Sequence, residues 1–147
     1  MSDSDLLSLY SGRILALAAD IPHHGRLAAP HGTARKRSPL CGSTVTVDVT
    51  VRDGRVAEFA QDVKACALGQ AAAAVLGANV LGRDLDELTA AESALRAMLK
   101  DGGPVPAAPF DGYEVLLPAR DFKNRHASIL LALEATVAAM TEATKAA

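Results

Sequence analysis

The sequence predicts one α+β domain over residues 1–147, in which a small antiparallel sheet, a hairpin plus a third strand, is covered by helices on one face. Valine alternates with polar residues through residues 44–51, which is typical of a half-buried strand. Asp53-Gly54 follows directly, and this pair favours a tight hairpin turn. Before and after the hairpin, apolar residues recur every three or four positions, which is the period of a helix.

The first segment, residues 5–18, is expected to form an amphipathic helix. Its apolar stripe consists of Leu6, Leu9, Tyr10, Ile14 and Leu17. Asp3 or Ser4 could cap its N-terminus, because both side chains accept hydrogen bonds from the first turn. Residues 20–40 hold three prolines, two glycines and three histidines without any period, so we expect an extended loop there.

Burial decides the expected register of the hairpin, whose returning strand covers residues 55–63. A two-residue loop would place Glu58 opposite Val49 on the core face, whereas a three-residue loop places Ala57 there. A slip of one residue moves every side chain to the other face. We therefore expect the three-residue loop, with Gly54 in a left-handed conformation as a bulge residue.

Helical segments follow the hairpin. Residues 66–80 form a helix of small residues that permits close packing. The next helix begins after Asp84, where Glu87 three residues on completes a capping box, and it ends at Asp101-Gly102-Gly103-Pro104. The remaining segments are a short turn or helix, residues 110–117, and a last helix, residues 121–140.

The composition excludes several functional classes. A net charge of -2, an aromatic content of 3% and the absence of Trp argue against a surface that binds nucleic acid. The first 20 residues lack the basic region of a signal peptide, and no run reaches the roughly 18 uninterrupted apolar residues of a membrane span. We therefore expect a cytoplasmic protein that binds neither nucleic acid nor membrane. The expected oligomeric state is a monomer or weak dimer, although the composition does not determine it.

Two cysteines flank the predicted hairpin. Cys41 lies in the loop before the first strand, and Cys66 lies where the small-residue helix begins. Inert core cysteines are the simpler interpretation of composition alone. Their placement favours chemistry, because the unpaired N–H groups and dipole of a helix N-terminus favour a thiolate. In a reducing compartment, paired cysteines indicate metal or sulfur chemistry more often than a disulfide.

The histidines and one basic run have simple structural interpretations. His126 stands on a mostly apolar helix, where a satisfied core histidine is common. His23, His24 and His31 are expected as solvated loop residues rather than zinc ligands. Arg35-Lys36-Arg37 is either a solvated surface or a docking patch for an acidic partner.

Six segments, taken in their order and spacing, resemble the IscU/NifU-like (SufU-like) family of iron–sulfur cluster assembly scaffolds. They are Tyr10, Pro22-His23-His24-Gly25, Pro39-Leu40-Cys41-Gly42-Ser43, Lys64-Ala65-Cys66-Ala67, Gly82-Arg83-Asp84-Leu85-Asp86-Glu87 and Arg125-His126-Ala127-Ser128-Ile129-Leu130. That family has Cys-Gly-Asp before a β-hairpin, Gly-Cys before an Ala/Ser-rich helix, and His-Cys-Ser-Ile-Leu in its last helix. The resemblance covers residues 10–135.

The resemblance implies a binding site rather than an enzyme. It assigns Cys41, Cys66 and His126 as ligands of a transient iron–sulfur cluster or of iron, with zinc as an alternative metal. The implied partners are a cysteine desulfurase, which supplies sulfur, and the apo-proteins that receive the cluster. The implied fold is the α+β domain already predicted from the residues, similar to IscU and SufE.

Two departures from the family pattern leave the implied site short of a ligand. Ala127 stands where the family has its third cysteine, and Ser43 stands where it has an aspartate. A cluster needs about four ligands. Ser43 is the additional candidate, although a hydroxyl is a poor substitute for a carboxylate. Asp121 or His31 could also supply the missing ligand.

These departures leave two alternatives to the scaffold function open. The first is a SufE-like sulfur acceptor, in which Cys41 or Cys66 carries a persulfide received from a cysteine desulfurase. The second is a degenerate zinc-binding interaction module of the same fold, in which the metal stabilises the domain.

Overall fold

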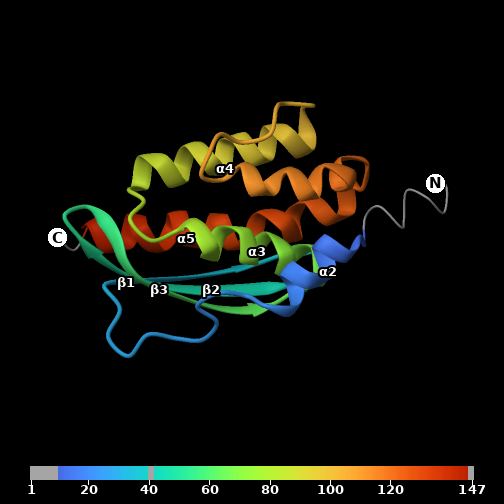
Figure 1. The fold of residues 1–147 in the computed structure, drawn as a ribbon. Coiled ribbons are helices and arrows are strands. Elements are labelled where there is room, and N and C mark those ends of the chain that lie inside the picture. The colour runs from blue at the N-terminus through green and yellow to red at the C-terminus, as the bar shows by residue number, and fades with distance from the viewer. Residues whose placement is uncertain (1–9, 40–41, 146–147) are drawn as a thin grey trace.

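The sheet has three antiparallel strands in the order β1-β2-β3 and carries helices on one face (Figure 1), which confirms the predicted α+β class. The computed structural model describes residues 10–39 and 42–145. The strands are β1 Gly32–Arg37, β2 Thr44–Arg52 and β3 Arg55–Lys64. The helices are α2 Gly12–Ala19, α3 Ala67–Asn79, α4 Leu85–Lys100 and α5 His126–Lys145, with 3-10 segments η1 Asp111–Asp121 and η2 Lys123–Arg125 before α5.

Strand β1 corrects the expectation that residues 20–40 are all loop. It pairs along its length with residues 44–49 of β2. It lies at an edge of the sheet and its last three residues, all basic, are exposed, so it has no apolar alternation. Gly32 is buried, and a Cβ there would collide with the backbone of α5 at Ala139. The close approach of α5 therefore takes the place of an apolar side chain.

The predicted hairpin register is wrong. The strands β2 and β3 are joined by the two-residue loop Asp53-Gly54, whose φ angles of 55° and 76° are those of a turn that matches the twist of a hairpin. Gly54 is left-handed as expected, but the bulge lies further on, at Ala57, which has no partner in β2. The bulge brings Phe59 opposite Val49. The extra residue of the bulge returns the apolar side chains of β3 to the core face, which the two-residue turn alone would have turned away from it.

The helix boundaries differ from expectation at both ends of the chain. Helix α2 begins after Ser11, whose hydroxyl accepts a hydrogen bond from the Ile14 N–H; Asp3 and Ser4 lie outside the described residues. Helix α5 begins at His126 rather than at residue 121. The preceding segment is 3-10 helix with Pro118 inside it, and proline lacks the N–H that an α-helix needs there. The predicted capping box of α4 is confirmed.

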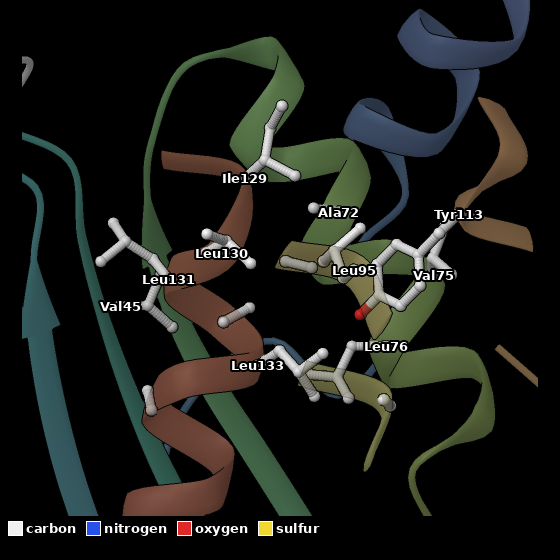
Figure 2. Close-up of a cluster of buried hydrophobic side chains, with 14 of the residues drawn as sticks. Val45, Ala72, Val75, Leu76, Leu95, Tyr113, Ile129, Leu130, Leu131 and Leu133 are labelled. Atoms are coloured by element: carbon white, nitrogen blue, oxygen red, sulfur yellow. The ribbon is translucent and has the colours of Figure 1, made fainter. Parts of the chain in front are cut away.

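Helix α5 forms the centre of the hydrophobic core. Figure 2 shows its Leu131 toward Val45 of β2, while Leu133 lies on the side of Leu76 from α3. Tyr113 of η1 is fully buried beside this cluster, and burial raises the pKa of its hydroxyl. Helix α5 also packs on α4, so it joins the sheet to both neighbouring helices.

Residues Lys123–Lys145 are long and apolar enough to meet a length and composition test for a membrane span, with a mean hydropathy of 1.3. However, 61% of the tested window is buried inside the fold. Central helices of globular cores pass the same test, so the result is weak evidence for a membrane segment.

Asp48 anchors the chain segment that crosses the sheet face opposite α5. Its buried carboxylate accepts hydrogen bonds from Arg26 (2.6 and 3.2 Å), the Leu27 N–H (3.0 Å) and the Thr33 hydroxyl (2.6 Å). Burial raises the pKa of this carboxyl, but the hydrogen bonds from Arg26, Thr33 and Leu27 outweigh burial and hold the pKa below its ordinary value. The ionised form of Asp48 therefore stabilises the fold.

Replacing Asp48 with Asn is expected to lower the free energy of unfolding at pH 7 by about 2 kcal/mol, because three donors lose an ionised acceptor. The depressed pKa makes this stabilisation present above about pH 4 and lost as the pH falls through the folded-state pKa. Urea unfolding at pH 7 and pH 3 should therefore show a smaller difference between the two proteins at pH 3. Exposed Asp111→Asn is the control, and an equal loss in both variants would contradict the prediction.

Candidate functional site

The loop between β1 and β2, residues 38–43, contains the first predicted ligand. Its base is closed by two main-chain hydrogen bonds: the Ser38 N–H donates to the Ser43 carbonyl (2.8 Å), and the Gly42 N–H donates to the Ser38 carbonyl (2.9 Å). Gly42 has a φ of 71°, which glycine adopts without strain. Cys41 lies outside the described residues, so its ligand role stays a prediction.

Cys66 lies at the N-terminus of α3, as the sequence predicts. It is the capping residue, with extended backbone, and its carbonyl accepts the hydrogen bond of the Gln70 N–H (2.9 Å). Its thiol is free and half-buried, and it makes no capping hydrogen bond. The N–H groups of the first helical turn favour negative charge at this position.

Three segments distant in sequence meet around the Ser128 hydroxyl, next to the Cys66 sulfur. Its Sγ atom lies 3.4 Å from the Ser128 Oγ atom, and the Ser128 hydroxyl donates a hydrogen bond to Ser43 Oγ at 3.1 Å. The two serines are 2% and 5% exposed. The β1–β2 loop, the start of α3 and the first turn of α5 therefore form one cluster. Ser43 was predicted from the sequence as a possible ligand, whereas Ser128 was not predicted as a site residue. The only sequence signal for Ser128 is its position two residues after His126.

His126 is buried at the first residue of α5, with 2% of its surface exposed. Its Nε2 atom lies 3.0 Å from the carbonyl oxygens of both Ala119 and Arg120. Because carbonyl oxygens only accept hydrogen bonds, Nε2 carries a proton, and in the neutral ring Nδ1 holds the free lone pair. A metal bound by this side chain would therefore use Nδ1. The ligand role of His126 stays a prediction.

Comparison with known proteins decides the family of the chain. The family model described as NifU-like N terminal domain matches residues 9–115. The chain belongs to this family. A crystal structure of the N-terminal part of a nitrogen-fixing NifU-like protein from Brucella abortus is 44% identical, with 97% of this chain and 99% of that chain covered and a TM-score of 0.94. None of the curated proteins matches the chain significantly.

A second solved structure has the same fold at a much lower sequence identity. It comes from the thermophile Fervidobacterium islandicum AW-1 and is described as a candidate iron–sulfur cluster assembly scaffold protein for a SUF system. It is 18% identical, covers 91% of this chain and 98% of its own, and has a TM-score of 0.80. At this identity the similarity establishes the fold alone.

The match to the NifU-like family includes some predicted site residues and ends before others. Residues 9–115 contain Cys41, Ser43 and Cys66, whereas His126 and Ala127 lie beyond the matched range. Ala127 is half-buried beside Ser128 and offers no ligand atom. Within the described ranges, 10–39 and 42–145, no three His, Cys, Asp or Glu side chains converge.

Two other candidates for the missing ligand of this NifU-like domain are His31 and Asp121. His31 precedes β1, whereas the Cys41 loop follows it, and six residues of strand separate them by roughly 20 Å. The Nδ1 atom of His31 accepts a hydrogen bond from the Val51 N–H at 2.9 Å. Asp121 is exposed at the end of η1. The structure therefore places His31 away from Cys66, and it shows no contact between Asp121 and Cys66 among the described residues.

Proposed function

We propose that this chain is a scaffold or carrier in iron–sulfur cluster assembly and not an enzyme. The observation that carries the proposal is the NifU-like family match over residues 9–115, a range that contains both cysteines of the chain. The cluster, or the iron from which it is built, is cargo that arrives and leaves. Because the thiols must stay reduced for this role, the proposal places the protein in the cytoplasm.

The proposed ligands are Cys41, Cys66 and His126. Cys66 supports the proposal by its half-buried free thiol at the start of α3. Cys41 supports it by its place in the sequence, within the matched range and two residues before Ser43, which belongs to the Cys66 cluster. His126 supports the proposal because its Nε2–H donates to two backbone carbonyls. Histidines that bind a metal through one ring nitrogen commonly donate the N–H of the other nitrogen to such a group.

The proposed partners are a cysteine desulfurase and the apo-proteins that receive the cluster. Arg35, Lys36 and Arg37 are exposed at the end of β1 that leads into the Cys41 loop. Their charge would attract an acidic partner surface and bring it to this end of the sheet before the cysteines react.

Anaerobic reconstitution with iron and sulfide tests the scaffold function. The wild-type chain is expected to retain both after desalting and to show the visible absorption of a cluster, whereas Cys66→Ala loses this by at least about tenfold, because one of two thiolates is gone. Ser93→Ala, an exposed change on α4, is the matched control. A wild-type chain that retains no iron and sulfide, or a Cys66→Ala variant that retains as much, would contradict the proposal.

A sulfur acceptor is the second candidate, favoured by Ala127 in the place of a third cysteine. In that reaction a thiolate of Cys41 or Cys66 attacks the outer sulfur of a desulfurase persulfide. A new S–S bond forms, the old one breaks, and its electron pair leaves on the desulfurase cysteine. Mass spectrometry of the chain after incubation with a desulfurase and cysteine would find sulfur added at a cysteine without iron.

Stoichiometric zinc whose removal unfolds the domain would instead favour a zinc-binding module.

A further inference from the structure

The Ser128 hydroxyl lies between two partners that compete for its single proton. Its oxygen is 3.1 Å from Ser43 Oγ, to which it donates, and 3.4 Å from Cys66 Sγ. A serine hydroxyl carries one donor hydrogen. While that hydrogen points to Ser43, a hydrogen bond to Cys66 requires the thiol to be the donor.

We propose that Ser128 is a positioning residue for Cys66, and that its hydroxyl turns from Ser43 to the Cys66 sulfur when this sulfur binds cargo. The inference rests on the proposed function, because a thiol that binds a metal or attacks sulfur has lost its proton and can only accept hydrogen bonds. A hydrogen bond to a charged acceptor is about twice as strong as one between neutral groups. Rotation about one C–O bond achieves the change without moving any heavier atom.

The packing around Ser128 holds its oxygen atom in place, so that only the hydroxyl hydrogen turns. A Cβ atom at Gly69 of α3 would lie 2.6 Å from Ser128 Oγ, so the absence of a side chain at Gly69 lets the first turn of α5 approach α3 this closely. Ser128 is 2% exposed, so bulk water has little access to its oxygen. Among the described residues, Ser128 provides the side-chain hydrogen-bond partner of the Cys66 sulfur.

Alkylation of the metal-free full chain by iodoacetamide at pH 7 tests the proposal. Site-resolved mass spectrometry follows Cys66, and Cys41 in the same molecule is the internal reference. Alkylation proceeds through the sulfur anion, and Ser128→Ala removes a hydrogen-bond donor to that sulfur, an interaction worth about tenfold for a charged acceptor. The greater nucleophilicity of the remaining thiolate offsets about half of this on a logarithmic scale. Cys66 in Ser128→Ala is therefore expected to react about threefold more slowly than in the wild type.

Ser43→Ala is the matched control, because it truncates the other serine of the same buried cluster. It removes the competing acceptor, so Cys66 is expected to react at least as fast as in the wild type. A general loosening of the cluster would move both variants in the same direction. The proposal is overturned if Cys66 in Ser128→Ala reacts at the wild-type rate or faster, or if Ser43→Ala slows it to the same extent.

Cobalt(II) gives a second readout and separates this inference from the proposed function. If the wild type binds cobalt, Ser128→Ala should move the sulfur-to-cobalt absorption band to longer wavelength, because the sulfur loses a hydrogen bond. An unmoved band would count against the positioning role. A wild type that binds neither cobalt nor iron would contradict the metal site. The alkylation rates would still decide the role of Ser128.

Discussion

Replacing Ala127 with cysteine is expected to raise the affinity of the chain for zinc, and its retention of iron and sulfide, by at least about tenfold. Ala127 is half-buried in the first turn of α5, directly before Ser128, whose hydroxyl lies 3.4 Å from the Cys66 sulfur. A third thiolate at this position would add to the two proposed thiolate ligands, Cys41 and Cys66. Loss of a group that only supports a ligand changes metal affinity by 10- to 100-fold in other proteins, so gain of a ligand should reach at least about tenfold.

The control for this change is Ala138→Cys, also a half-buried alanine on α5 but eleven residues further along the helix. At 1.5 Å per residue the two positions lie about 16 Å apart, too far for the same metal ion. Competition with a chromophoric chelator measures zinc affinity, and iron and sulfide analysis after desalting measures cluster retention. Equal gains from both cysteines would mean that any added thiol suffices, and no gain at residue 127 would contradict the position of the site.

Substitutions of His126 are expected to separate a structural role from a ligand role. Gln places an amide nitrogen close to the position of Nε2 and keeps a donor for the Ala119 and Arg120 carbonyls, whereas Asn is too short to reach them. His126→Asn should therefore lower the free energy of unfolding by about 2 kcal/mol, because buried acceptors lose their donor. His126→Gln should lower it by less than about 1 kcal/mol.

The metal affinity of the same two variants tests whether His126 is a ligand. If Nδ1 of His126 binds the metal, His126→Gln should lose about tenfold in cobalt or zinc affinity while its unfolding curve stays close to that of the wild type. Urea unfolding and chelator competition measure the two quantities on the same samples. Wild-type metal affinity in His126→Gln would remove His126 from the ligand set, and wild-type stability in His126→Asn would refute the anchoring of α5 through its ring.

The sequence predicted those elements whose signals are local. The valine alternation of β2, the Asp53-Gly54 turn and the capping box of α4 each depend on residues within a few positions of one another, and all three are present. The same holds for Cys66, which is the N-terminal capping residue of α3, where small residues start. Local hydrogen bonds and side-chain periodicity determine these features in any surrounding structure.

Features that depend on a partner segment escaped prediction. Strand β1 carries a basic run and a buried glycine, so only its pairing with β2 and its contact with α5 make it a strand. The bulge at Ala57 changes the hairpin register without leaving a pattern in the sequence. The burial of Asp48 depends on Arg26, which is 22 residues away.

The candidate site divides in the same way. The sequence by itself determined that Cys41 and Cys66 flank the hairpin, that Ser43 and Ala127 replace expected ligands, and that the chain resembles the NifU-like family. Only the tertiary structure decided that Ser128 contacts both Ser43 and Cys66, and that the His126 ring hydrogen-bonds through Nε2 to two carbonyls. These contacts join residues up to 85 positions apart. The contacts of Ser128 form where α3 and α5 pack closely at Gly69, and no periodicity within one segment reports on such packing.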